Sequence, residues 1–135
     1  MDHSSEKNAK VAFEYYTITM HHYIVEHQDK YGFTVLHHAV YRGNLLAVQH
    51  LLAMKEAKAD EADEQGNTAL HLAAQGDHRQ ICDVLMDHKE GVRARNRDGL
   101  TPLHLAASAG SIACIKALLH KEQPGLEVGL QHRLA

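Results

Sequence analysis

A short phrase occurs three times in this chain of 135 residues, and this repetition constrains the fold more than any other feature. The copies are GFTVLHHAVYRGN (32–44), GNTALHLAAQGDH (66–78) and GLTPLHLAASAGS (99–111). Their threonines, Thr34, Thr68 and Thr101, set a period of 34 and then 33 residues. A period of this length is typical of small units that stack, because one unit alone cannot bury its apolar face.

Each copy begins with a turn and continues into a helix. The turns are Asp-Lys-Tyr-Gly (29–32), Asp-Glu-Gln-Gly (63–66) and Asn-Arg-Asp-Gly (96–99). A threonine two residues after each glycine is expected to cap the helix, since its side-chain oxygen accepts from free N–H groups of the first turn. Pro102 follows Thr101 at the first helical position, where its missing N–H has no cost.

Each phrase predicts a pair of helices. The first is rich in alanine, which allows close helix approach, and the second carries an apolar stripe with the spacing of one buried face. The stripes are Ala47/Val48/Leu51/Leu52, Ile81/Cys82/Val84/Leu85 and Cys114/Ile115/Leu118/Leu119.

With its turn, its T-P-L-H-L-A-A helix and its second helix, the chain resembles the ankyrin-repeat family. DGLTPLHLAASAG (98–110) matches this signature almost letter for letter. The resemblance implies an all-α solenoid of stacked helix-turn-helix repeats with β-turn fingers. Its expected parts are an N-terminal helical cap or degenerate repeat (1–28), three repeats (29–62, 63–95 and 96–122), and a C-terminal tail, partial cap or truncated unit (123–135).

The second repeat departs from the pattern at the turn between its helices. Gly43 and Gly110 stand there in the other repeats, whereas the equivalent residue is Asp77, with Gly76 one place early. Aspartate tolerates a left-handed backbone better than most residues. We therefore expect the fold to survive, with a special or strained turn at this point.

The chain contains 13 histidines, and three of them recur with the repeat: His37, His71 and His104. Equivalent residues of stacked helices lie about 8–10 Å apart, whereas zinc ligands must lie within about 2.1 Å of one ion. The resemblance implies a structural role for these histidines together with Thr34, Thr68 and Thr101. His22 and Glu26 share a helix face but do not form an H-E-x-x-H motif, so no metal or cofactor is expected.

Composition excludes several function classes. A net charge of −3 argues against nucleic-acid binding, and no apolar run is long enough to insert into a membrane. We expect neither a signal peptide nor a catalytic site from this sequence. Cys82 and Cys114 lie in apolar stripes and are expected to be reduced core thiols, which fits an intracellular location, cytoplasmic or nuclear, or a host-cell interior for a pathogen effector.

The resemblance implies that a partner protein contacts the concave surface formed by finger tips and first helices. Tyr, Phe and Arg in the first repeat are typical hot-spot residues of binding surfaces. The alternative is that Tyr31 and Phe33 pack against the N-terminal cap instead. The charges also differ between an acidic step (60–64) and a basic step (93–97). The candidate residues are Lys30, Tyr31, Phe33, Tyr41, Arg42, Glu64, Gln65, Asn67, Gln75, Arg95, Arg97, Asp98, Leu100 and Ser108.

The sequence thus predicts a monomeric, non-catalytic module for protein–protein interaction, acting as an adaptor, inhibitor or host-directed effector. One alternative is an ankyrin segment of a larger enzyme or channel, used for targeting or regulation. The other is a histidine-dependent metal or pH sensor.

Overall fold

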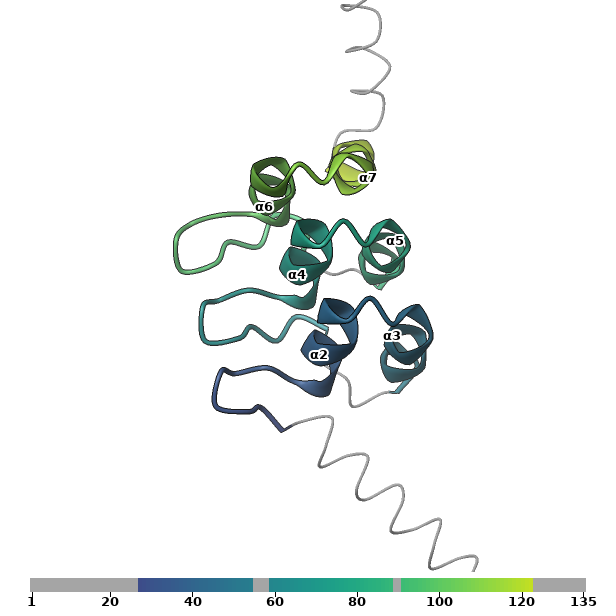
Figure 1. The fold of residues 1–135 in the computed structure, drawn as a ribbon, viewed down its shortest axis with the longest axis vertical. Coiled ribbons are helices and arrows are strands. Elements are labelled where there is room, and N and C mark those ends of the chain that lie inside the picture. The colour runs from purple at the N-terminus through teal and green to yellow at the C-terminus, as the bar shows by residue number, and fades with distance from the viewer. Residues whose placement is uncertain (1–26, 55–58, 89–90, 123–135) are drawn as a thin grey trace, which may run out of the picture.

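The computed structural model describes residues 27–54, 59–88 and 91–122, which form six helices and contain no strand. Figure 1 shows two layers of helices, with a finger-like loop preceding each helix of the first layer. The predicted all-helical stack is therefore confirmed. The expected cap (1–28), apart from its last two residues, and the expected tail (123–135) lie outside the described residues. The first layer contains α2 (Val35–Tyr41), α4 (Ala69–Gln75) and α6 (Pro102–Ala109), and the second contains α3 (Leu45–Leu52), α5 (Arg79–Asp87) and α7 (Ile112–Glu122).

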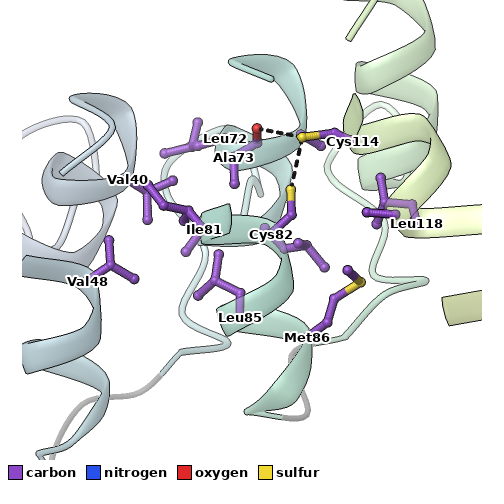
Figure 2. Close-up of a cluster of buried hydrophobic side chains, with 14 of the residues drawn as sticks. Val40, Val48, Leu72, Ala73, Ile81, Cys82, Leu85, Met86, Cys114 and Leu118 are labelled. Atoms are coloured by element: carbon purple, nitrogen blue, oxygen red, sulfur yellow. Dashed lines mark hydrogen bonds between the residues drawn. The ribbon is translucent and has the colours of Figure 1, made fainter. Parts of the chain in front are cut away.

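The core lies between the two layers and is continuous from repeat to repeat (Figure 2). Val48 of α3, Leu85 of α5 and Leu118 of α7 are completely buried there. Burial of one such side chain stabilises a fold by about 1.5–3 kcal/mol. Ala73 of α4 is also completely buried, which fits the close helix approach expected from the alanine-rich first helices.

Each finger is shaped by one Asp or Asn side chain at its start. Its Oδ1 accepts from two backbone N–H groups, two and four residues later, at 2.9–3.0 Å. Short polar side chains favour this type of turn. The three residues with this role are Asp29, Asp63 and Asn96.

Neighbouring fingers are joined by backbone hydrogen bonds. The Glu64 N–H donates to the Tyr31 carbonyl at 2.9 Å, and the Arg97 N–H donates to the Gln65 carbonyl at 3.0 Å. Gly32 has φ +79°, and a Cβ there would stand 2.6 Å from the Glu64 nitrogen. Glycine is therefore required both by the backbone conformation and by the close approach of the next finger.

His71 connects the second repeat to the third. Its Nδ1 accepts from the Thr68 N–H at 3.1 Å and lies 2.9 Å from Thr68 Oγ1, while Nε2 lies 2.8 Å from the Leu100 carbonyl oxygen. Because a carbonyl oxygen can only accept, Nε2 carries the proton and Nδ1 is the acceptor. The ring is completely buried, so all its polar atoms need these partners.

The first repeat has the same arrangement, and the third has half of it. His37 Nε2 lies 3.1 Å from the Asn67 carbonyl oxygen, and the ring is buried. His104 Nδ1 lies 2.8 Å from Thr101 Oγ1, yet its side chain is exposed, and no following finger stands above it among the described residues. The three histidines therefore differ in burial although their sequence contexts are alike.

Asp77 adopts the left-handed conformation expected from the sequence, with φ +56° where Gly43 and Gly110 have +69° and +72°. The structure adds a contact that the sequence did not indicate. Asp77 Oδ1 accepts from the Cys114 N–H, at the third residue of α7, at 3.1 Å. Asp77 of the second repeat thus caps a helix of the third repeat. A negative charge is also favourable at the start of a helix.

The ring of His78 lies close to the displaced Gly76. A Cβ on Gly76 would stand 2.7 Å from His78 Nε2, and a Cβ on Gly43 would stand 2.8 Å from the same ring. His78 is the N-cap residue of α5, but its side chain makes no capping hydrogen bond. Its backbone carbonyl accepts from the Cys82 N–H, while its ring lies close to two glycine turns.

We expect Asp77→Ala to lower the free energy of unfolding by about 1–2 kcal/mol, because it removes the cap of α7 and places alanine in a left-handed conformation. Asp77→Asn retains an acceptor oxygen and tolerates this backbone, so this variant should lower the free energy of unfolding by less than about 1 kcal/mol. Urea unfolding measures both variants. Equal stabilities of the alanine variant and the wild type would contradict the capping role.

We expect His71→Ala to cost about 2–3 kcal/mol, because it leaves the buried Thr68 N–H without its partner and removes the hydrogen bond to the Leu100 carbonyl, which keeps only the Asn96 N–H. His104→Ala is the matched control, with the same threonine contact but an exposed ring, and should cost at most about 1 kcal/mol. Urea unfolding at pH 7.5 compares the two variants. Equal losses would show that the contact between repeats contributes nothing beyond the local cap.

Stability should also depend on pH through His71. Burial lowers the pKa of His71 below the ordinary 6.5, and the hydrogen bond with the Leu100 carbonyl only partly opposes this effect. Below about pH 6.5 the unfolded chain therefore binds a proton that the folded chain excludes, so the free energy of unfolding falls between pH 7.5 and 5.5. His71→Ala should reduce this slope, which urea unfolding at pH 7.5 and pH 5.5 measures.

Candidate functional site

The concave side of the stack contains a cavity of about 250 Å³ between the first two fingers and the first-layer helices α2 and α4. The first repeat supplies aromatic side chains, the second finger supplies acids and amides, and α4 supplies one apolar and one amide side chain. The lining residues are Tyr31, Phe33, Tyr41, Asp63, Glu64, Gln65, Asn67, Leu72 and Gln75.

The aromatic side of the cavity is held in place by stacking. Phe33 lies nearly parallel to His37, with ring centroids 5.4 Å apart, and makes an edge contact with His38 at 5.2 Å. Tyr41 lies 6.5 Å from Phe33. Tyr31 and Tyr41 nevertheless remain 57% and 69% exposed, so both rings are accessible to a partner.

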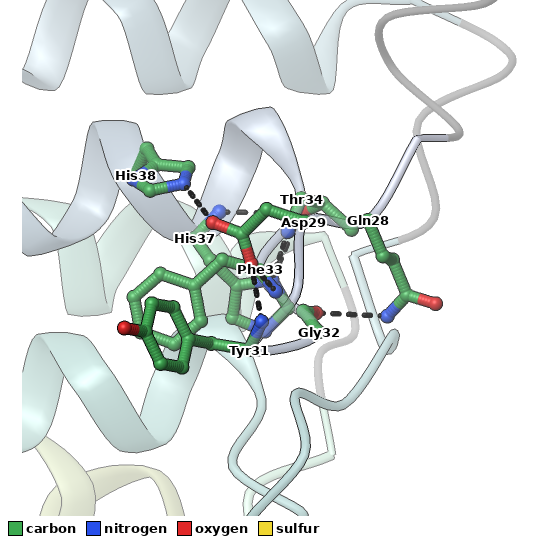
Figure 3. A network of polar contacts seen from close by, with 8 residues as sticks. All are labelled: Gln28, Asp29, Tyr31, Gly32, Phe33, Thr34, His37 and His38. Atoms are coloured by element: carbon green, nitrogen blue, oxygen red, sulfur yellow. Dashed lines mark hydrogen bonds and ion pairs between the residues drawn. The ribbon is translucent and has the colours of Figure 1, made fainter.

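A polar contact between His38 and Asp29 lies next to these aromatic rings (Figure 3). His38 Nε2 lies 2.9 Å from Asp29 Oδ2, which ties α2 to the base of the first finger. Partial burial raises the pKa of Asp29, but hydrogen bonds from the Phe33 N–H, His38 and the Tyr31 N–H outweigh it and leave the pKa below the ordinary 3.8. Asp29 is therefore ionised at neutral pH and fixes the finger that carries Tyr31.

The repeat motif, the helical stack and the fingers now identify the family. A family model of ankyrin repeats, in three copies, matches residues 36–131. The chain belongs to the ankyrin-repeat family. Ankyrin repeats are a protein-interaction module, generally without catalytic activity.

Relatives of this ankyrin chain occur in proteins of very different kinds. Ankyrin repeat domain-containing protein 13C of Danio rerio is 33% identical over 69% of the chain and 19% of its own length. Tyrosine-protein kinase Shark of Drosophila melanogaster is 32% identical over 91% of the chain and 13% of its own length. A transient receptor potential cation channel subfamily A member 1 homolog of Caenorhabditis elegans is 36% identical over 65% of the chain and 7% of its own length. The chain thus spans a small part of each of these relatives.

The ankyrin stack brings seven of the residues proposed from the sequence to one cavity. They come from two fingers and two helices, and the cavity also includes Asp63 and Leu72, which the sequence did not single out. The sequence identified Asp63 as part of a turn and of the acidic step, and Leu72 only as part of the repeat motif. The seven residues are Tyr31, Phe33, Tyr41, Glu64, Gln65, Asn67 and Gln75.

Asn67 has a structural duty as well as a place in the cavity. It is buried, its carbonyl accepts from His37 Nε2, and its Oδ1 accepts from Asn96 Nδ2 at 2.9 Å. Leu100 is similar, because its carbonyl accepts from His71. Substitution of Asn67 would remove its side-chain bond with Asn96 and disturb the stack as well as a surface, so it is not suited to a binding test.

The other proposed residues lie outside the cavity. Lys30 Nζ stands 5.1 Å from the centroid of the Tyr31 ring, and Arg95 Nη1 donates to the Gly99 carbonyl at 3.1 Å. Arg42 follows α2 as its C-cap residue, and Arg97 and Ser108 are exposed on the third repeat.

A larger groove, of about 590 Å³, lies between α5 and α7 in the second layer. Its carboxylates each have a cation nearby: Arg79 Nε stands 3.9 Å from Asp83, and Lys121 Nζ stands 3.9 Å from Asp87. Neither Tyr nor Phe appears among the described residues that line it. The smaller concave cavity is the better candidate, because it combines exposed aromatic rings with carboxylates that form no ion pair within the described part of the chain.

The described segments contain no cluster of three or more potential metal ligands. No helix within residues 27–54, 59–88 and 91–122 is both long and apolar enough to cross a bilayer.

Cys82 and Cys114 lie together in the core rather than at the surface. Their sulfurs are 3.3 Å apart, and both thiols are free and completely buried (Figure 2). The hydrogen bond with Cys114 and burial raise the pKa of the Cys82 thiol well above its ordinary value. Since the thiolate is the reactive form, this pair is unsuited to nucleophilic catalysis.

We expect Ellman's reagent to label the folded chain at least about a hundredfold more slowly than the unfolded chain, because the core must open first. Both thiols should react in urea. The absorbance of the released thiol anion measures the rate and the number of thiols. Rapid labelling of the folded chain would contradict the core assignment, and the absence of thiols in urea without reductant would show a disulfide instead.

Proposed function

We propose that this chain is a non-catalytic module that binds a partner protein through its concave surface. The observation that carries this proposal is the cavity between the first two fingers, where Tyr31 and Tyr41 are largely exposed beside Glu64. Tyrosine rings supply large contact areas at little cost in conformational entropy. A surface of this kind serves an adaptor, an inhibitor or an effector equally well.

A second use of the same surface is supported by the relatives. A kinase and a channel homolog each contain a segment similar to most of this chain. We therefore also propose that such a surface can serve as a targeting or regulatory segment of a longer protein. Both uses require the same binding surface, so one binding test addresses both.

The structure offers little support for a histidine-dependent sensor. In His37 and His71 both ring nitrogens are engaged by the protein, so neither is available to a metal ion. We propose instead that the recurring histidines hold the stack together. We also place the module inside a cell, where a reducing environment keeps Cys82 and Cys114 as thiols.

The proposal predicts that Tyr41→Ala combined with Arg42→Ala weakens partner binding while helicity and melting temperature stay unchanged. Both side chains are exposed at the end of α2, so their loss leaves the core intact. Peptides selected on the full chain from a displayed random library supply ligands, and fluorescence anisotropy measures their affinities. Loss of a binding hot spot costs 2 kcal/mol or more, so we expect Kd to rise by more than about tenfold.

The matched control is Gln49→Ala combined with His50→Ala, an exposed pair on α3 in the second layer. This variant should bind the selected peptides as the wild type does. If the Tyr41/Arg42 variant also retained full affinity, binding through this part of the concave surface would be refuted.

A further inference from the structure

The cavity between the first two fingers is acidic. Asp63 and Glu64 line it, and no Lys, Arg or His appears among the described residues of its lining. Asp63 Oδ1 already accepts from the Gln65 and Asn67 N–H groups, which holds this carboxylate in place. The Glu64 side chain is exposed and makes no hydrogen bond or ion pair with any residue in the described part of the chain. The cavity therefore contains a carboxylate that is free to bind a cation.

The aromatic side of the cavity also suits a cation. The faces of Tyr and Phe rings attract positive charge within about 6 Å of the centroid. Tyr31 already shows this preference, because Lys30 Nζ stands 5.1 Å from its centroid. Tyr41, whose ring centroid lies 6.5 Å from that of Phe33, has no such cation among the described residues and is 69% exposed.

We propose that this cavity receives an arginine side chain of the partner protein, an inference that rests on the proposed function. A guanidinium is flat, stacks on aromatic rings and pairs with a carboxylate through two parallel hydrogen bonds. A volume of about 250 Å³ is small for a drug-sized ligand but suits a single long side chain. Tyr41 and Phe33 provide the rings, and Glu64 provides the carboxylate.

The chemistry of the cavity disfavours the other occupants. An acidic or phosphorylated side chain would meet two carboxylates of its own sign. A purely apolar side chain would remove Glu64 from water and offer no hydrogen bond in return. Only a cationic side chain satisfies both the rings and the carboxylate.

The next gap along the stack cannot act in the same way. Arg97 stands at the position in the third finger that Glu64 has in the second, and Arg95 lies nearby. Positive charge there repels a second arginine of the partner. The partner's arginine therefore has one site, which sets the register of the bound segment along the fingers.

The probe for this inference is the acetylated pentapeptide Gly-Gly-Arg-Gly-Gly amide, titrated into the full chain and followed by amide NMR shifts. The neutral comparison is the same peptide with citrulline, which retains the shape of arginine without its charge. We expect Kd on the order of millimolar for the arginine peptide, shifts centred on Tyr31, Tyr41 and Glu64, and at least about tenfold weaker binding of the citrulline peptide.

Glu64→Gln should raise the Kd of the arginine peptide by about tenfold. The matched control is Asp60→Asn, which removes the same charge from an exposed residue outside the cavity lining and should leave Kd unchanged within about twofold. Unchanged amide shifts away from the cavity establish that both variants fold.

The inference is overturned by equal binding of the arginine and citrulline peptides, by equal effects of the two variants, by shifts located elsewhere, or by no binding at all. These results leave the proposed function standing as long as the library peptides still lose affinity in the Tyr41/Arg42 variant. Retained affinity of the library peptides in that variant would instead remove the proposed function itself.

Discussion

The fold depends on a hydrogen bond that each buried histidine makes across a boundary between repeats. His37 donates to the Asn67 carbonyl and His71 to the Leu100 carbonyl, and each ring simultaneously accepts from the threonine that begins its own helix. One side chain thus sets both the start of a helix and the position of the next finger. Because the rings are buried, loss of either contact leaves polar groups without water.

This constraint also positions the candidate site. Asn67 and Leu100, which receive the histidine bonds, are the last finger residues before the next helix, so each finger is held at a defined height above its neighbour. The backbone bond from Glu64 to Tyr31 adds a second tie between the fingers. Hydrogen bonds therefore hold the backbone of the two fingers beside the cavity, which lowers the entropy lost when a partner binds.

Much of the fold could be predicted from the sequence because its determinants are local. Several determinants act within one repeat: the threonine caps, Pro102 at a first helical position and the apolar stripes. The spacing of the repeated phrase then gives the length of each unit. The left-handed Asp77 also follows from local chemistry. The contact between Asp77 and Cys114 could not be predicted in this way, since it joins residues 37 positions apart through the offset between two repeats.

The sequence by itself determined the family, the helical stack and a set of surface residues that suit a partner protein. Only the tertiary structure decided which of those residues lie together in one cavity. Tyr41 and Glu64 are distant in the chain and share one cavity because the second finger stacks beside α2, whereas Arg95 and Arg97 lie outside that cavity, on the third finger. The physical reason is that hydrogen bonds between repeats set the distance and offset of neighbouring units, and these determine which side chains face one another.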